Sequence, residues 1–135
     1  MNIKNLNRMN ASKFFYFFIF IIFYSCSNNK VSFDSKRQAI TSSYSLSKII
    51  IENLNTGDVI IIRKNKNVKS SLVFMNKMDT INYSYFSDWL EEKKLKSFSL
   101  EPNTKYRIEN ASIGDATNYV LLMETDNNKI LRLTR

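Results

Sequence analysis

The sequence predicts a mainly β protein, an antiparallel β-sandwich with one short helix, preceded by a signal peptide and a flexible tether. Short Ile/Val-rich runs alternate with polar residues at the period of β-strands, and turn residues separate them at hairpin spacing. The N-terminal segment is basic and then apolar, and it ends in a serine and a cysteine. We therefore divide the 135 residues into a lipoprotein signal peptide (1–25), a tether (26–45) and a β-sandwich domain (46–135).

The N-terminal segment has the layout of a secretory signal. Lys4, Arg8 and Lys13 precede eleven consecutive apolar residues, from Phe14 to Tyr24. A membrane-spanning helix requires about 20 apolar residues, and polar residues follow directly here. A permanent transmembrane anchor is therefore disfavoured, and a cleaved signal is expected.

Two cleavage sites remain open. Small residues at positions 25 and 27 permit ordinary cleavage after Ser27, which would release a soluble secreted protein. The run Phe23-Tyr24-Ser25-Cys26 resembles the lipobox of bacterial lipoproteins, in the looser form found in Bacteroidetes-type bacteria. That resemblance implies cleavage before Cys26, whose thiol would receive a diacylglycerol and whose amino group usually receives a further acyl chain such as palmitate. The protein would then be lipid-anchored in the cell envelope, in the outer membrane facing the periplasm or the surface.

Residues 27–45 are rich in serine and asparagine, and their apolar residues follow no regular period. We interpret this segment as a tether that would span about 25 Å as a flexible coil. The alternative is that residues 31–40 add a first edge strand.

The remaining chain contains a series of predicted strands. They cover residues 46–53, 58–64, 68–74, 80–86, the alternating stretch around Tyr106 and Ile108, residues 119–124 and residues 129–134. Asn55-Thr56-Gly57 suits a three-residue hairpin loop with Gly57 in the left-handed region, and Asp126-Asn127-Asn128 predicts another hairpin. Ile81, Tyr83 and Tyr85 fall on one face of their strand, which we expect to face the core.

Residues 87–96 are the exception to the strand pattern. Ser87 can cap a helix, acidic residues follow in the first turn and lysines stand in the last. Trp89 and Leu90 have helical spacing with the lysines, so one short helix is predicted here.

The segment from Leu100 to Ile108 resembles the L-x-P-x-T-x-Y-x-I segment of fibronectin type III domains. In that family the leucine fills the core, the proline shapes the turn, and the tyrosine bonds back to nearby backbone in a tyrosine corner. The resemblance implies an immunoglobulin-like or fibronectin-like sandwich, with Leu100, Pro102 and Tyr106 as fold residues. The chain departs from the family because Trp89 is its only tryptophan and does not lie in the second strand.

Composition excludes most catalytic machinery. The chain has no histidine, which removes Ser-His-Asp and Cys-His arrangements and most zinc sites. It has one cysteine and two glycines, so neither an intrachain disulfide nor a glycine-rich phosphate loop can form. Its neighbouring carboxylates are adjacent or close to hairpin turns. We expect no enzymatic activity, no cofactor and no metal.

The expected function is therefore a binding or scaffolding role in the cell envelope, toward a protein or glycan partner that the sequence does not identify. The alternative is an envelope subunit that binds a small ligand or a glycan. Export makes a nucleic-acid partner remote, although removal of the signal leaves 17 Lys/Arg against 12 Asp/Glu, a net charge of +5. Asp79-Thr80-Ile81 resembles the short motif that Bacteroidetes-type bacteria O-glycosylate on exported proteins, which would make Thr80 a modification site.

Overall fold

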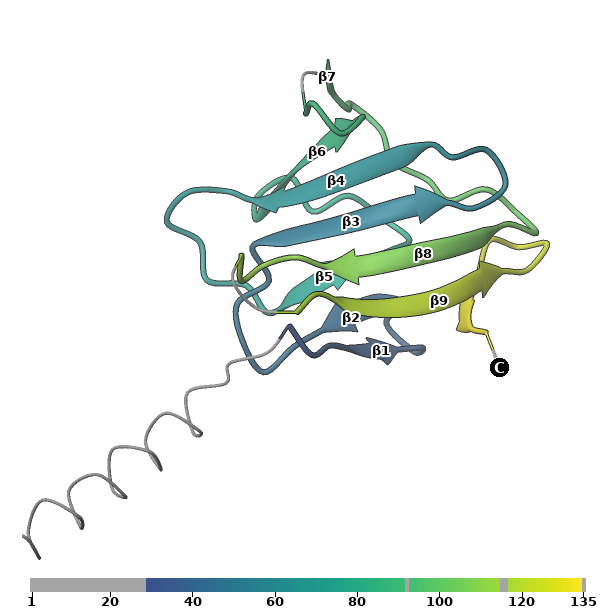
Figure 1. Ribbon diagram of the computed structural model, residues 1–135, viewed down its shortest axis with the longest axis horizontal. Coiled ribbons are helices and arrows are strands. Elements are labelled where there is room, and N and C mark those ends of the chain that lie inside the picture. The colour runs from purple at the N-terminus through teal and green to yellow at the C-terminus, as the bar shows by residue number, and fades with distance from the viewer. Residues whose placement is uncertain (1–28, 92, 115–116, 135) are drawn as a thin grey trace, which may run out of the picture.

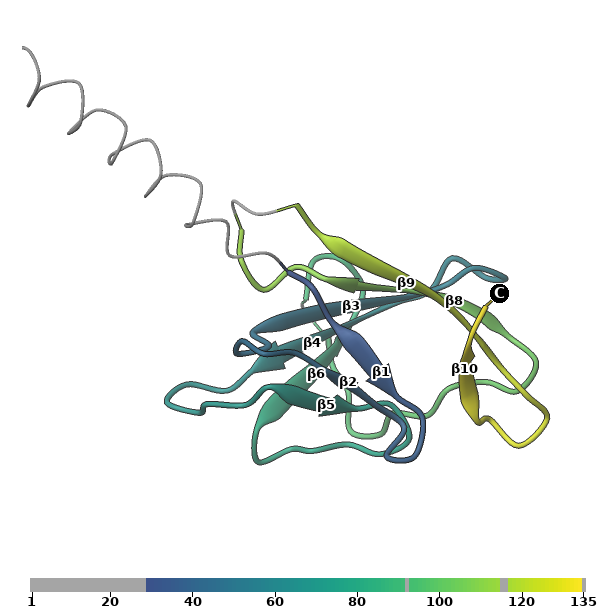
Figure 2. The ribbon, with the colours of Figure 1, turned by 90° about the horizontal axis from the view of Figure 1, so that it is seen from below.

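The computed structural model describes residues 29–91, 93–114 and 117–134; the predicted signal peptide (1–25) and Cys26 lie outside them. The described chain is mainly β and forms two antiparallel sheets that lie over each other as two layers (Figures 1 and 2). The strands are β1 (Ser32–Asp34), β2 (Ala39–Thr41), β3 (Lys48–Asn53), β4 (Val59–Lys64), β5 (Leu72–Phe74), β6 (Tyr83–Ser87), β7 (Lys93–Lys94), β8 (Lys105–Asn110), β9 (Tyr119–Thr125) and β10 (Leu131–Leu133).

The larger sheet has the order β10-β9-β8-β3-β4-β6-β7, and the smaller has the order β1-β2-β5. The centre of the larger sheet is built from isoleucines: Ile51 of β3 lies opposite Ile60 of β4 on one side and Ile108 of β8 on the other. Branched side chains in directly opposed positions pack well across neighbouring strands. The smaller sheet joins strands from two separate parts of the chain, because β5 pairs with β2.

The core lies between the two layers. Alternate residues of the larger sheet point into it, and the smaller sheet covers them with Ile40 and Val73, both fully buried. The core cluster consists of Val31, Ile40, Leu46, Ile49, Ile51, Ile62, Val73, Met75, Tyr83, Tyr85, Phe98, Leu100, Tyr106, Ile108, Met123 and Leu131. Burial raises the pKa of the phenol groups of Tyr83, Tyr85 and Tyr106, which keeps all three neutral well beyond physiological pH.

Most of the predicted strands are present. Residues 46–53 and 58–64 correspond to β3 and β4, and Gly57 between them has a φ of 81°, as the hairpin prediction requires. In the β9–β10 hairpin the residue with positive φ is Lys129 (62°), one position after the asparagines. The Asp126 carboxylate instead accepts backbone N–H groups of Asn128 and Ile130, both at 2.9 Å.

One part of the predicted core face is wrong. Tyr83 and Tyr85 are buried in β6, whereas Ile81 precedes the strand and is 83% exposed. Residues 79–82 form a turn in which Tyr83 N donates to Asp79 O at 2.9 Å, so the alternating pattern ends before Ile81 reaches the sheet.

The predicted flexible tether, residues 26–45, is also wrong over its described part. Residues 29–45 contain β1 and β2, so the alternative of strand structure in residues 31–40 is what the fold adopts. Val31, Ala39 and Ile40 are buried, and β2 pairs with both β1 and β5. Three apolar residues of this serine-rich segment are thus covered by the fold, whereas Tyr44 is 53% exposed. The burial of these three residues is decided by distant partners that a local period cannot reveal.

Side-chain amides attach this segment to the larger sheet at two places. Asn29, 1% exposed, donates from Nδ2 to Ile113 O (3.1 Å), and its Oδ1 accepts from Ile113 N (2.9 Å). Asn110 Nδ2 donates to Asn29 O at 2.8 Å. Gln38 repeats the reciprocal pattern with Leu131, accepting from its N at 2.7 Å and donating to its O at 3.3 Å. The side-chain amides of Asn29 and Gln38 thus each bond the backbone N–H and C=O of one residue, as the backbone of a neighbouring strand would.

The predicted short helix at residues 87–96 is wrong as well, since the described residues there form no helix. Ser87 is the last residue of β6, and Lys93–Lys94 form β7 against Phe86 and Ser87. Asp88 and Glu91 have positive φ values of 82° and 56°, which turn the chain back. A ten-residue helix is marginal in water, whereas the return of the chain along β6 brings Phe98, which follows β7, against Tyr85, with ring centroids 5.5 Å apart.

We expect residues 46–135, the predicted domain, not to fold alone, whereas residues 27–135 fold cooperatively. Deletion of residues 29–45 leaves β5 unpaired and removes Val31 and Ile40 from the core. Each such side chain contributes about 1.5–3 kcal/mol by burial, a large share of a total of about 5–15 kcal/mol. Urea melts followed by circular dichroism of the two fragments test this. A cooperative transition of residues 46–135 matching that of the longer fragment would contradict it.

Candidate functional site

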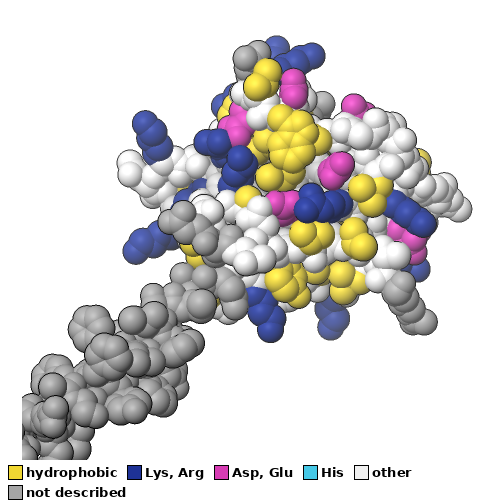
Figure 3. Space-filling view, in the orientation of Figure 1, with side chains coloured by type: hydrophobic (Ala, Val, Ile, Leu, Met, Phe, Trp, Pro, Cys, Tyr) yellow, Lys and Arg dark blue, Asp and Glu magenta, His cyan; other side chains and the backbone are white. Residues whose placement is uncertain are grey.

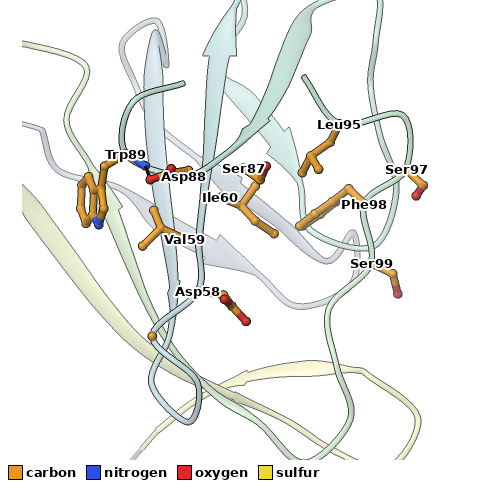
Figure 4. Close-up of a pocket in the computed structure, with 11 residues that line it drawn as sticks. Asp58, Val59, Ile60, Ser87, Asp88, Trp89, Leu95, Ser97, Phe98 and Ser99 are labelled. Carbon is orange, nitrogen blue, oxygen red and sulfur yellow. Dashed lines mark hydrogen bonds between the residues drawn. The ribbon is translucent and has the colours of Figure 1, made fainter. Parts of the chain in front are cut away.

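A cavity of about 460 Å³ opens where β4 begins and β6 ends (Figure 4). Ile60, Leu95 and Phe98 give it an apolar wall, with Ile60 and Phe98 lying close together in the close-up. Trp89, 55% exposed, lies beside Val59 at the other side. The cavity is lined by Gly57, Asp58, Val59, Ile60, Ser87, Asp88, Trp89, Leu95, Ser97, Phe98 and Ser99.

Two tight turns place the carboxylates of this cavity. Gly57 turns the chain into β4, and the carboxylate of Asp58 next to it accepts a hydrogen bond from Thr56 Oγ1 at 2.7 Å. Asp88 takes the left-handed region, where a short polar side chain is tolerated, and its Oδ1 accepts from Trp89 N at 2.5 Å. Both carboxylates thus stabilise their own turns while they remain exposed at the cavity.

An ion-pair cluster holds the β6–β7 turn over the outer face of the larger sheet. The Glu91 carboxylate pairs with Arg63 of β4, and it lies 3.4 Å from Lys48 Nζ of β3. This turn lies on the face where Ile50, Val59 and Ile61 form a second, smaller apolar cluster. The position of Trp89 is therefore set by contacts from strands that are distant in sequence.

The chemistry of the cavity suits non-covalent binding. An exposed indole offers an apolar face, and serine hydroxyls and two carboxylates offer hydrogen-bond partners, the combination that a polar ligand with an apolar face requires. Among the residues that the structure describes, no group of three or more His, Cys, Asp and Glu side chains could hold a metal ion.

The fold residues predicted from the sequence lie together at the start of β8. The hydroxyl of Tyr106 accepts a hydrogen bond from Glu101 N at 2.8 Å, five residues upstream. Leu100 is buried in the core, and Pro102 is exposed in the turn, where its carbonyl accepts from Thr104 Oγ1 at 2.9 Å. The polar end of the ring thereby gains a partner while its body packs in the core.

The other two predicted sites are not part of this cavity. Thr80 is exposed in the 79–82 turn, where its carbonyl accepts from Asn65 Nδ2 at 3.2 Å. Cys26 lies outside the described residues. The sequence did not predict the cavity, because its walls come from three separate segments of the chain, residues 57–60, 87–89 and 95–99. The sequence pattern also placed Trp89 in a helix that the structure does not contain.

No family model, curated protein or solved structure matches the chain. No helix within the described ranges is long and apolar enough to cross a membrane.

We expect Tyr106→Phe to lower the free energy of unfolding by about 1 kcal/mol, because it removes the acceptor of the Glu101 N–H and leaves the ring in place. Tyr106→Ala also removes a large buried ring and should cost about 3–5 kcal/mol. Urea melts of residues 27–135 provide the measurement, with Tyr119→Phe, at a tyrosine 36% exposed, as the control. Equal stability of Tyr106→Phe and the parent would show that water replaces this bond at no cost.

Proposed function

We propose that the protein is a lipid-anchored, non-enzymatic binding module of the bacterial cell envelope. The observation that carries the proposal is the apolar run from Phe14 to Tyr24, followed by Ser25 and the only cysteine of the chain. The described fold begins at Asn29, three residues after that cysteine, so a lipid on Cys26 would stand directly beside the folded domain.

We further propose that the domain is immunoglobulin-like or fibronectin-like. In immunoglobulin folds the first, second and fifth strands share one sheet, and the third, sixth and seventh share the other. The β1-β2-β5 sheet and the adjacent strands β3, β8 and β9 support that assignment, with β8 in the place of the sixth strand. The Tyr106 hydroxyl bond to Glu101 N, at the start of β8, is the bond that a tyrosine corner makes.

Exposed apolar side chains on the outer face of β9 support a role in binding a protein partner. Val120 and Leu122 point outward from β9 and are 38% and 54% exposed, whereas Leu133 of β10, 52% exposed, lies opposite the buried Met123 and therefore on the other face of the sheet. Figure 3 shows hydrophobic side chains gathered along this lower part of the outer face. Contiguous apolar surface of this kind marks interaction sites.

Acylation of Cys26 is the first test of the proposal. Mass spectrometry of the membrane-extracted protein should find a chain that begins at acylated Cys26, and Cys26→Ala should abolish that species. Acyl chains contribute about 0.8 kcal/mol per buried CH₂, so two or three hold the domain at the membrane durably. A soluble, unmodified chain beginning at Asn28 would instead establish ordinary cleavage after Ser27 and a secreted protein.

The Trp89 cavity supports a second candidate, the binding of a glycan. The indole face suits the apolar face of a sugar ring, and the carboxylates of Asp58 and Asp88 suit its hydroxyls. Since Trp89 is the only tryptophan, its fluorescence reports directly on this cavity.

We expect titration with soluble envelope oligosaccharides to change Trp89 fluorescence. In calorimetry, Trp89→Ala should weaken binding by about 2 kcal/mol, roughly 30-fold, as for a buried aromatic anchor. Leu133→Ala, at an exposed leucine of β10, is the matched control and should bind like the parent. Unchanged affinity of Trp89→Ala would exclude this cavity as the glycan site.

A further inference from the structure

One end of the two-layered domain carries the start of the described chain, the β8–β9 connection to which Asn29 is bound, and three further loops, residues 42–47, 65–71 and 79–82. We call it the anchor end; the loop between β4 and β5 projects from it at the left of Figure 1. The described chain begins here, since Asn29 is bound to Asn110 and Ile113 at the end of β8. Three residues span at most about 10 Å, so a lipid on Cys26 keeps this end within that distance of its attachment point.

Hydrogen bonds join the three loops to the first residues of the domain. Ser42 Oγ donates to Lys30 O at 3.1 Å, and Ser42 N donates to Ser71 O at 3.0 Å. Leu46 N donates to Ser70 O at 2.8 Å, which ties the first loop to the second. Asn65 Nδ2 donates to Ile81 O at 2.9 Å, which ties the second loop to the third. The anchor end therefore presents one continuous surface of fixed shape.

The charges of this surface are basic. Lys66 and Lys69 are exposed on the 65–71 loop, and Figure 3 shows Lys and Arg side chains projecting at this end. Among the described residues of the three loops, the acidic one is Asp79, whose carboxylate accepts hydrogen bonds from the backbone and side chain of Asn82. At the opposite end the charges are mixed, since the loops carry the carboxylates of Asp34, Asp58, Glu101 and Asp126 together with the exposed basic side chains of Lys36, Arg37 and Lys129.

Two large apolar side chains stand out from the same loops. Tyr44 on the 42–47 loop is 53% exposed, and Ile81 on the 79–82 turn is 83% exposed. A tyrosine suits the boundary between headgroups and acyl chains, because its ring is apolar and its hydroxyl remains hydrated. Basic side chains around such groups are attracted to anionic lipid.

We propose that the anchor end docks against anionic phospholipid, with Lys66 and Lys69 at headgroup phosphates and with Tyr44 and Ile81 in the interfacial layer. The inference rests on the lipid anchor proposed above, because the anchor selects which end meets the bilayer. Docking orients the domain so that the Trp89 cavity, at the end of β6, stays clear of the lipid.

The test uses the full chain, produced in cells and reconstituted into vesicles. Ile81→Cys carries an environment-sensitive fluorophore, and Asn127→Cys carries the same label at the opposite end. With vesicles of phosphatidylcholine and phosphatidylglycerol in equal parts, the label at position 81 should shift to the blue and resist aqueous quencher, and the label at position 127 should not. Pure phosphatidylcholine or high salt should reverse the shielding, because both remove the electrostatic attraction.

Lys66→Gln combined with Lys69→Gln should lower the ratio of docked to undocked label by about fivefold per lysine. Lys93→Gln combined with Lys94→Gln removes the same charge from two exposed lysines of β7 and should leave the ratio unchanged. Equal access of quencher to both labels in anionic vesicles, or equal effects of the two double variants, would overturn the inference.

Mass spectrometry of the same sample reports acylation of Cys26 separately. If Cys26 carries no lipid, the proposed function fails, and the labelled chain is remade with Cys26→Ser and mixed with the same vesicles. Shielding at position 81 would still support docking by this end, and its absence would overturn it. An anionic polysaccharide or protein that protects the label better than the vesicles would also overturn it.

Discussion

Burial of an apolar layer between the two sheets is the interaction on which the remaining structure depends. With a single cysteine, the chain has no intrachain disulfide to hold these layers together. The isoleucines of β3, β4 and β8 supply one side of the layer, and Ile40 and Val73 supply the other. Three tyrosines add bulk, and the hydroxyls of Tyr85 and Tyr106 accept backbone N–H groups of Asp79 and Glu101. Because every strand except the exposed β7 contributes to this layer, the loops at both ends acquire fixed positions.

Reciprocal amide contacts decide how the first segment joins that layer. Asn29 and Gln38 each pair with both backbone groups of a single residue, Ile113 and Leu131, in the manner of a β-ladder. Polar side chains in an apparent linker thus act as structural elements. If Cys26 carries the proposed lipid, the described domain begins three residues after it, at an end held by these amide contacts.

The β6–β7 region shows how tertiary contacts override a local pattern. Residues 87–96 satisfy the start and stop signals of a helix, yet the chain reverses at Asp88 and Glu91 and returns along β6. The return places Phe98 on Tyr85 and brings Glu91 to Arg63 and Lys48. These contacts create the cavity beside Trp89. The candidate binding site therefore exists because the local preference was not followed.

The sequence by itself determined the mainly β class, the central strands β3, β4, β8 and β9, the Gly57 turn and the bond of the Tyr106 hydroxyl. The class, the strands and the turn follow from strand periodicity and turn chemistry within about ten residues, and the Tyr106 bond was implied by the resemblance of residues 100–108 to the fibronectin type III segment. Only the tertiary structure decided that residues 29–45 belong to the core, that Ile81 faces solvent and that residues 87–96 form a hairpin edge. It also decided which loops gather at the anchor end. The burial of residues 29–45 and the packing of Phe98 on Tyr85 depend on partners more than ten residues away, and burial against such partners outweighs the local preference of the chain.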